Sequence, residues 1–250
     1  MPTIRQYRKN TLNPQSRWLL ESTKNITSQY GEDGIIETIF SKIVPLPNGP
    51  WCVEFGARGG VRVNNTFNLI FQEKWQGVLI EGNPKHFPGL QKVCQGHDNA
   101  YPVNRLIGLE GEDSLDNILK QTPCPTQFDL VSMDVDGRGW HIWKSLVAFR
   151  PRVVLVAFNP NIPNDVVFIQ DPDPTVNQAS SLLAFVELGK EKGYELICAT
   201  CCNAFFIVAE EFRKLGIKDN SIDAMYMPSI DEKVFDLFDG KRSAAQASQP

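Results

Sequence analysis

The sequence predicts an α/β fold, an open doubly wound sheet of seven strands that ends in an antiparallel hairpin. Three observations predict this fold. Apolar segments of strand length alternate with segments of helical periodicity from residue 51 onward. Residues 153–157 are continuously apolar, as in parallel strands that helices cover on both faces. Only four residues separate the last two strand segments, too few for a crossover helix, so those strands pair antiparallel.

The elements follow in a regular order. Residues 1–27 are a polar, irregular lead-in, and residues 28–34 open an amphipathic segment over 35–43. We expect strands over 51–55, 77–81, 101–108, 128–134, 152–158, 194–199 and 204–208. Helices are expected over 66–74, 84–94, 113–121, 140–148 and 179–192. We expect residues 28–240 to form one Rossmann-like domain and residues 241–250 to form a disordered tail.

A long segment over residues 159–177 interrupts this alternation after the fifth strand. It is rich in Pro, Asn and Asp and contains no periodic apolar pattern. Loops of this length in compact domains are usually lids or binding loops. Ligands of doubly wound sheets bind at the carboxyl ends of the strands, so this loop is placed to cover a site there.

Composition excludes several classes of protein. The chain of 250 residues has 42% hydrophobic content and a formal net charge of −4, which argues against a nucleic-acid partner held by bulk electrostatics. No apolar run approaches the length of a membrane span, and the N-terminus is too polar for a signal peptide. The six cysteines lack zinc spacing, and Cys198, Cys201 and Cys202 are interpreted as core residues or free thiols rather than a metal site. We therefore expect a cytoplasmic protein.

The most informative stretch is the end of the first strand. Glu54 and Gly56 precede a glycine-rich turn that extends to Gly60, and Glu81 follows about twenty residues later at the end of the second strand. Glycine lets the backbone approach a ligand closely, and a carboxylate can accept hydrogen bonds from a ribose diol. This combination favours a nucleoside-type ligand over a turn of purely structural importance.

Several motifs together resemble the FkbM-like class I methyltransferases, which use S-adenosylmethionine. The motifs are SQYGEDG at 28–34, VEFGA at 53–57, Asn65-Thr66, GVLIE at 77–81 and DVDG at 134–137. The resemblance covers about residues 28–208 and includes the terminal hairpin. It implies that Glu54, Gly56, Gly60 and Asp134 belong to the cofactor site, that Glu81 binds the ribose, and that Asn65 and Thr66 lie beside the same pocket.

The chain departs from this family at three acidic positions. RGG at 58–60 replaces an expected WDG, DGRGW at 136–140 replaces DGNDY, and AFN at 157–159 lacks an expected Glu. Two of the changes introduce Arg58 and Arg138. A permanent positive charge opposes a divalent cation and pairs with a carboxylate, so we expect no metal and an anionic small-molecule substrate.

The candidate catalytic residues are Arg58, Arg138, Trp140, His141 and Asn159. Each has a plainer interpretation. The arginines can pair with Glu54 and Asp136 at the surface, and Asp134 and Asp136 can cap the following helix. Trp140 can belong to the core rather than to a pocket wall, and His141 can be a general base or a bystander. Asp134, Asp136 and Asn159 also leave a metal site open.

Three functions remain open from the sequence. The favoured one is a metal-independent cyclisation or pericyclic rearrangement, of the Diels–Alder type, on a methyltransferase fold in natural-product metabolism. Such a reaction needs positioning and cationic groups that polarise the substrate. The alternative is an S-adenosylmethionine-dependent O-methyltransferase of a small molecule, in which case the cofactor site is not vestigial. The third is a binding protein with a dead site.

Overall fold

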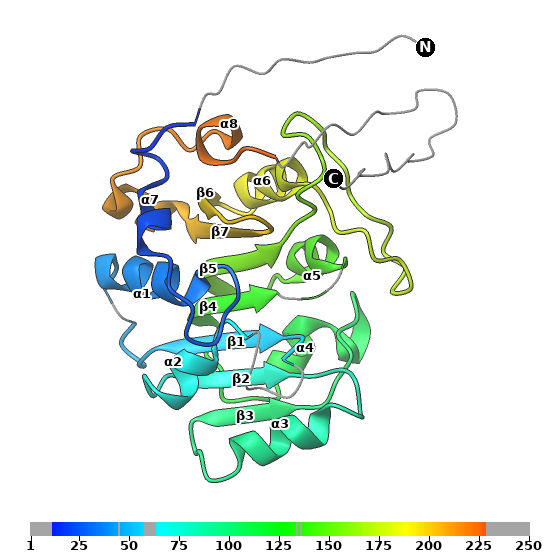
Figure 1. Cartoon of the computed structure of the whole chain (residues 1–250). Helices are drawn as coiled ribbons and strands as arrows, with labels where there is room; N and C mark the ends of the chain where they lie inside the picture. The colour runs from blue at the N-terminus through cyan, green and yellow to red at the C-terminus, as the bar shows by residue number, and fades with distance from the viewer. Residues whose placement is uncertain (1–11, 45, 58–63, 134, 136, 229–250) are drawn as a thin grey trace, which may run out of the picture.

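The strands form the sheet that the sequence predicts. The computed structural model describes residues 12–44, 46–57, 64–133, 135 and 137–228. Within these residues seven strands are ordered β3-β2-β1-β4-β5-β7-β6, and β7 runs antiparallel to both of its neighbours, β5 and β6 (Figure 1). This is the class I methyltransferase type of Rossmann-like sheet, and the predicted fold class is confirmed.

The strand bounds are close to the predicted ones, with one exception. The strands are β1 (Trp51–Phe55), β2 (Gln76–Ile80), β3 (Ala100–Val103), β4 (Gln127–Met133), β5 (Arg150–Ala157), β6 (Tyr194–Ala199) and β7 (Asn203–Val208). The prediction of a strand over 101–108 was too long. β3 lies at the edge of the sheet and pairs only with β2, whose last residue, Ile80, is opposite Val103. Beyond that pair β3 has no partner strand.

Helices connect the strands. They are α1 (Glu32–Lys42), α2 (Phe67–Phe71), α3 (Phe87–Cys94), α4 (Leu115–Leu119), α5 (Gly139–Ser145) and α6 (Leu182–Glu191). Ser114 and Ser181 cap α4 and α6, because each hydroxyl accepts a hydrogen bond from a backbone N–H of the first turn. Three elements that the sequence did not predict follow β7: α7 (Ala209–Phe212), η3 (Arg213–Leu215) and α8 (Ile222–Met225).

The lead-in before α1 also contains a short element. Trp18–Ser22 form a 3₁₀ helix, η1, which contacts α1 and places Leu19 in the core, fully buried. Within the described residues no helix is both long and apolar enough to cross a bilayer.

The amino ends of β4 and β5 hold a buried ion pair. The Arg152 guanidinium donates to the Asp129 carboxylate at 2.9 Å, and the backbone N–H of Trp51 donates to the same carboxylate at 3.0 Å. Arg152 also donates to Glu211 at 3.0 Å, which attaches α7 to the sheet. These bonds fasten the edge of the sheet opposite to the carboxyl ends of the parallel strands, where loops are free to form a site.

Candidate active site

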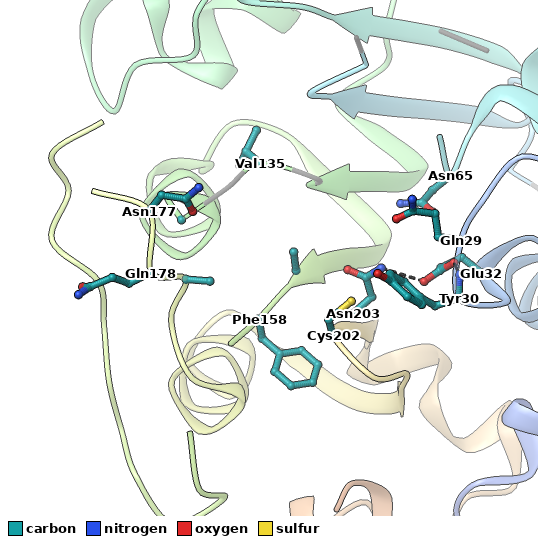
Figure 2. A pocket seen from close by; sticks show the side chains of 13 residues that line it. Gln29, Tyr30, Glu32, Asn65, Val135, Phe158, Asn177, Gln178, Cys202 and Asn203 are labelled. Atoms are coloured by element: carbon teal, nitrogen blue, oxygen red, sulfur yellow. Dashed lines mark hydrogen bonds between the residues drawn. The ribbon is translucent and has the colours of Figure 1, made fainter. Parts of the chain in front are cut away.

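A cavity of about 270 Å³ opens at the carboxyl edge of the sheet. Its walls come from the segment before and at the start of α1, the loop after β1, the ends of β4 and β5, the end of the long loop, and the β6–β7 turn. Five lining side chains are carboxamides: Gln29, Asn65, Asn177, Gln178 and Asn203. Figure 2 shows Tyr30, Glu32 and Asn203 together at one wall and Asn177 and Gln178 at the opposite one.

The carboxylate of this cavity is Glu32, at the first position of α1. Its side chain is fully buried. One oxygen accepts a hydrogen bond from Asn203 Nδ2 at 2.8 Å, and the other accepts from the Tyr30 backbone N–H at 2.7 Å. Asn203 reaches this edge because β7 is antiparallel, so that its first residue lies opposite Ala157, the last residue of β5.

The neighbouring acid, Asp33, organises the chain that leads into the cavity. Its carboxylate accepts hydrogen bonds from the backbone N–H groups of Ile26, Thr27 and Ser28 at 2.7–2.9 Å. This arrangement folds the SQYGEDG motif so that Tyr30 and Glu32 both line the cavity. Negative charge that develops on Cys202 is the largest cause that raises the pKa of the Tyr30 phenol, and burial, Cys201 and Glu32 add to it.

Glu54 acts on the cavity indirectly, through Asn65, which Figure 2 shows near Gln29 and Glu32. Its buried carboxylate accepts from the backbone N–H groups of Asn65 and Thr66 at 2.9 and 3.1 Å and from the Thr66 hydroxyl at 2.5 Å. Asn65 in turn donates to the Ser132 hydroxyl at 3.1 Å and lines the cavity. Glu54 therefore positions the end of the loop after β1. Asn65 and Thr66 were both expected beside the pocket, and of these two Asn65 lines the cavity.

Gly56 and Glu81 lie at the adjacent ends of β1 and β2. Gly56 has φ +79°, a left-handed conformation that favours glycine, and the following N–H of Ala57 donates to Ile80 O at 3.4 Å. Glu81 is only 5% exposed, and its carboxylate accepts from the Asn83 N–H at 2.6 Å. Neither Gly56 nor Glu81 lines the cavity of Figure 2. Arg58, Gly60, Asp134 and Asp136 lie outside the described residues.

Arg138 immediately precedes α5. Its Nη1 donates to Ile107 O at 3.3 Å, and it is not among the residues that line the cavity. Its charge adds to the hydrogen bonds from Thr175 that lower the pKa of Asp173, a residue of the long loop. The structure therefore places Arg138 between the loop after β3 and the long loop.

Trp140 and His141 lie in the first turn of α5, and each side chain makes a hydrogen bond to a backbone carbonyl. The indole N–H of Trp140 donates to Ala184 O in α6 at 3.1 Å, and the side chain is 8% exposed. His141 Nε2 lies 2.6 Å from Gln170 O. A carbonyl oxygen can only accept, so Nε2 carries the proton and Nδ1 is the ring atom available as a base. Neither side chain lines the cavity.

The long loop is held in place by buried side chains. Asn159 Nδ2 donates to Gln178 O at 2.7 Å, which ties the two ends of the loop together. The Gln170 side-chain oxygen accepts from the N–H groups of Gln178 and Ala179 at 2.7 and 2.8 Å. The loop contains no helix or strand over residues 159–180, so it extends beyond the predicted 159–177, and α6 begins later than the predicted residue 179. Residues 177–179 of the loop line the cavity.

The structure brings together Asn65 and residues that the sequence analysis did not select: Tyr30, Glu32 and Asn203. Tyr30 and Glu32 belong to a motif that contributed to the resemblance, and Asn203 begins an antiparallel strand, so its position at the carboxyl edge follows from the hairpin. Within the described part of the chain, no three His, Cys, Asp or Glu side chains converge to hold a metal.

Comparison with known proteins gives only distant likenesses. No family profile and no curated protein sequence matches this chain. Among solved structures, it is similar to the N-terminal domain of EvdMO1 with SAH bound, at 13% identity and a TM-score of 0.44 over 71% of this chain and 80% of that one. It is also similar to a SAM dependent methyltransferase from Aquifex aeolicus, at 11% identity and a TM-score of 0.41 over 72% of this chain and 90% of that one.

A third similar structure is the [4+2]-cyclase SpnF, at 12% identity and a TM-score of 0.44 over 74% of this chain and 68% of that one. The methyltransferase-type fold is therefore assigned from the order and direction of the strands in this chain, and not from these likenesses.

Proposed function

We propose that this protein is a small-molecule O-methyltransferase that uses S-adenosylmethionine, as its resemblance to FkbM-like enzymes implies. The single observation that carries the proposal is the contact between the turn after β1 and the end of β2. The Ala57 N–H donates to Ile80 O, so the left-handed Gly56 stands beside Glu81. A glycine turn and a carboxylate at adjacent strand ends fit a nucleoside.

The Glu81 carboxylate is suited to accept hydrogen bonds from the ribose of the cofactor. Glu81 is held by its own backbone, which donates to Val103 O at 3.0 Å and accepts from Asn104 Nδ2 at 2.7 Å. The carboxylate uses one lone pair on the Asn83 N–H, and a carboxylate has further lone pairs to accept a vicinal diol. When bound, S-adenosylmethionine supplies a methyl group on a positively charged sulfur.

The cavity beside Asn65 and Glu32 would hold the acceptor. Its carboxamides donate and accept hydrogen bonds, which orients a hydroxyl group of a small molecule. Glu32 is the carboxylate that lines it, and each of its oxygens retains a lone pair beyond its bond to Asn203 or Tyr30. In this proposal Glu32 accepts the proton that the acceptor hydroxyl loses on methylation.

The test is an incubation of the full chain with S-adenosylmethionine carrying an isotopically labelled methyl group and a panel of small alcohols and carboxylic acids. We expect one labelled methyl group in a product of higher mass. Glu32→Gln should lower the rate by roughly 10²–10⁴-fold, the usual contribution of a general base. Glu37→Gln, on the exposed face of the same helix, is the matched control and should leave the rate unchanged.

A second candidate is the metal-independent rearrangement of a carboxylate-bearing substrate. One observation favours it: Arg138 Nε is buried and has no hydrogen-bond partner among the described residues. A buried cationic donor of this kind can hold a carboxylate. The same incubation separates the candidates. A rearrangement gives an isomer of equal mass without S-adenosylmethionine, and its rate depends on Arg138. Methyl transfer gives a heavier product, requires S-adenosylmethionine and does not depend on Arg138.

A further inference from the structure

Two consecutive cysteines form the turn between β6 and β7. Cys201 Sγ and Cys202 Sγ are 3.8 Å apart. Cys201 is exposed, and the half-buried Cys202 lines the cavity, where Figure 2 shows it near Asn203 and Tyr30. Both thiols can therefore be reached from solvent, and one of them forms part of the cavity wall.

The backbone around the pair is held on both sides. The Thr200 N–H donates to Asn203 O at 2.8 Å, and the Asn203 N–H donates to the Thr200 hydroxyl at 3.1 Å, which closes the turn. The carbonyl of Cys202 accepts from the Phe158 N–H at 2.8 Å, and that of Cys201 accepts from the Tyr226 hydroxyl at 3.2 Å. The two sulfurs are thus presented together by a fixed turn.

The other four cysteines have a different environment. Cys52, Cys94, Cys124 and Cys198 are buried in the core. Burial raises the pKa of each of their thiols, to about 11 for Cys94 and to about 12 for Cys124 and Cys198. Buried thiols of this kind react slowly at neutral pH, so soft electrophiles can distinguish the pair in the turn from the rest.

The spacing of the two sulfurs decides what can bridge them. An atom that forms two bonds of about 2.3 Å to sulfur, at an angle between roughly 95° for a pyramidal centre and 110° for a tetrahedral one, holds the sulfurs about 3.4–3.8 Å apart, which includes the separation observed here. A disulfide instead needs about 2.0 Å between the sulfurs and usually at least about 4.4 Å between the Cα atoms. Consecutive Cα atoms are about 3.8 Å apart, so a disulfide would be strained.

We propose that Cys201 and Cys202 form a chelating site for a thiophilic metal or metalloid electrophile at the edge of the cavity. The chain supplies two sulfur ligands and the bound species brings its remaining ones. A trivalent arsenical with one organic substituent meets this requirement. Its oxide, R–As=O, reacts with both thiols: two As–S bonds form, both S–H protons leave with the oxygen as water, and arsenic remains trivalent, so no oxidant is needed.

The test uses phenylarsine oxide as the probe, with the full chain, calorimetry and intact mass spectrometry. We expect one phenylarsenic group per chain. Cys201→Ser and Cys202→Ser should each weaken binding by at least about 100-fold, because the second As–S bond of a chelate forms at high effective concentration. Cys94→Ala removes a buried thiol, keeps the pair and should bind like the native protein. Prior alkylation of the native protein with iodoacetamide should also abolish binding.

Two results would overturn the proposal. One is a failure of the variants to discriminate: the native protein binds phenylarsine oxide no more tightly than the serine variants do, or Cys94→Ala weakens binding as much as they do. The other is rapid closure of the pair by dilute peroxide into a disulfide, seen as a mass loss of two hydrogens, that a monothiol does not reopen. Release of the arsenical by a small dithiol but not by a monothiol would support chelation.

Discussion

Glu32 and Asn203 lie 171 residues apart in the chain and meet at the wall of the cavity, where Glu32 Oε1 accepts a hydrogen bond from Asn203 Nδ2 at 2.8 Å. The bond joins the first turn of α1 to the first residue of β7. Both side chains are buried, at 0% and 8% exposure. The cavity wall therefore depends on a contact between two distant segments, and the bond carries stability as well as shape.

Asn203→Ala should reduce the free energy of unfolding by about 1.5–3 kcal/mol, the scale of a hydrogen bond to a charged group, because the buried Glu32 oxygen loses its donor. Urea unfolding followed by tryptophan fluorescence measures it. Asn220→Ala is the matched control, because Asn220 makes the same kind of bond to Glu195 at 2.7 Å in a more exposed place. A cost as large for Asn220 would contradict the importance of burial.

Arg152→Met should destabilise the fold by about 3–5 kcal/mol, because it leaves the carboxylate of Asp129 buried without its partner. Arg150→Met removes an ion pair with Glu210 in which both side chains are substantially exposed, and should cost about 0–1 kcal/mol. Both variants change an arginine of the same strand, so their midpoints in urea are directly comparable. Equal midpoints would show that the Asp129–Arg152 pair contributes no more than a surface pair.

Gly137→Ala should loosen the long loop. Gly137 has φ +93°, and a Cβ atom added there would stand 2.3 Å from the Gln170 side chain. Gly49 has φ +78° and nothing within 4 Å of the added atom, so Gly49→Ala isolates the conformational strain of roughly 1–3 kcal/mol. We expect Gly137→Ala to lower the free energy of unfolding by more than Gly49→Ala does, and to speed proteolysis within residues 159–180. If both variants behave alike, the contact with Gln170 does not hold the loop.

The rate at which iodoacetamide alkylates Cys94 should rise with pH, because burial raises the pKa of this thiol. The thiolate is the reactive form, and a pKa of about 11 leaves roughly one thiolate in a thousand at pH 8 for Cys94. Its rate should therefore rise about tenfold per pH unit across pH 7–9. Peptide mapping by mass spectrometry at each pH gives the rate, and a plateau near pH 8 would rule out the raised pKa.

The fold was predictable because its signals are local. Alternating apolar segments fixed six of the seven strands to within about two residues. The exception, β3, ended early because its partner strand ended, which no local pattern records. The hairpin followed from the short distance between β6 and β7.

The site was less predictable, because the role of a polar side chain depends on what it meets. Glu54 carries the sequence signal of a ligand-binding acid, yet it binds the backbone of Asn65 and Thr66. Trp140 and His141 follow a turn at the carboxyl edge, but the contacts to Ala184 and Gln170 draw them away from the cavity. Asn203 carries no motif, and only the direction of β7 places it at the site.

The most direct test of the central claim is calorimetric titration of S-adenosylmethionine into the native protein and Glu81→Ala, with the exposed Glu110→Ala as control. We predict saturable binding by the native protein and by Glu110→Ala, and binding weaker by about 1.5–3 kcal/mol in Glu81→Ala. Absence of binding to the native protein at millimolar concentration, or equal affinity in all three proteins, would contradict the account.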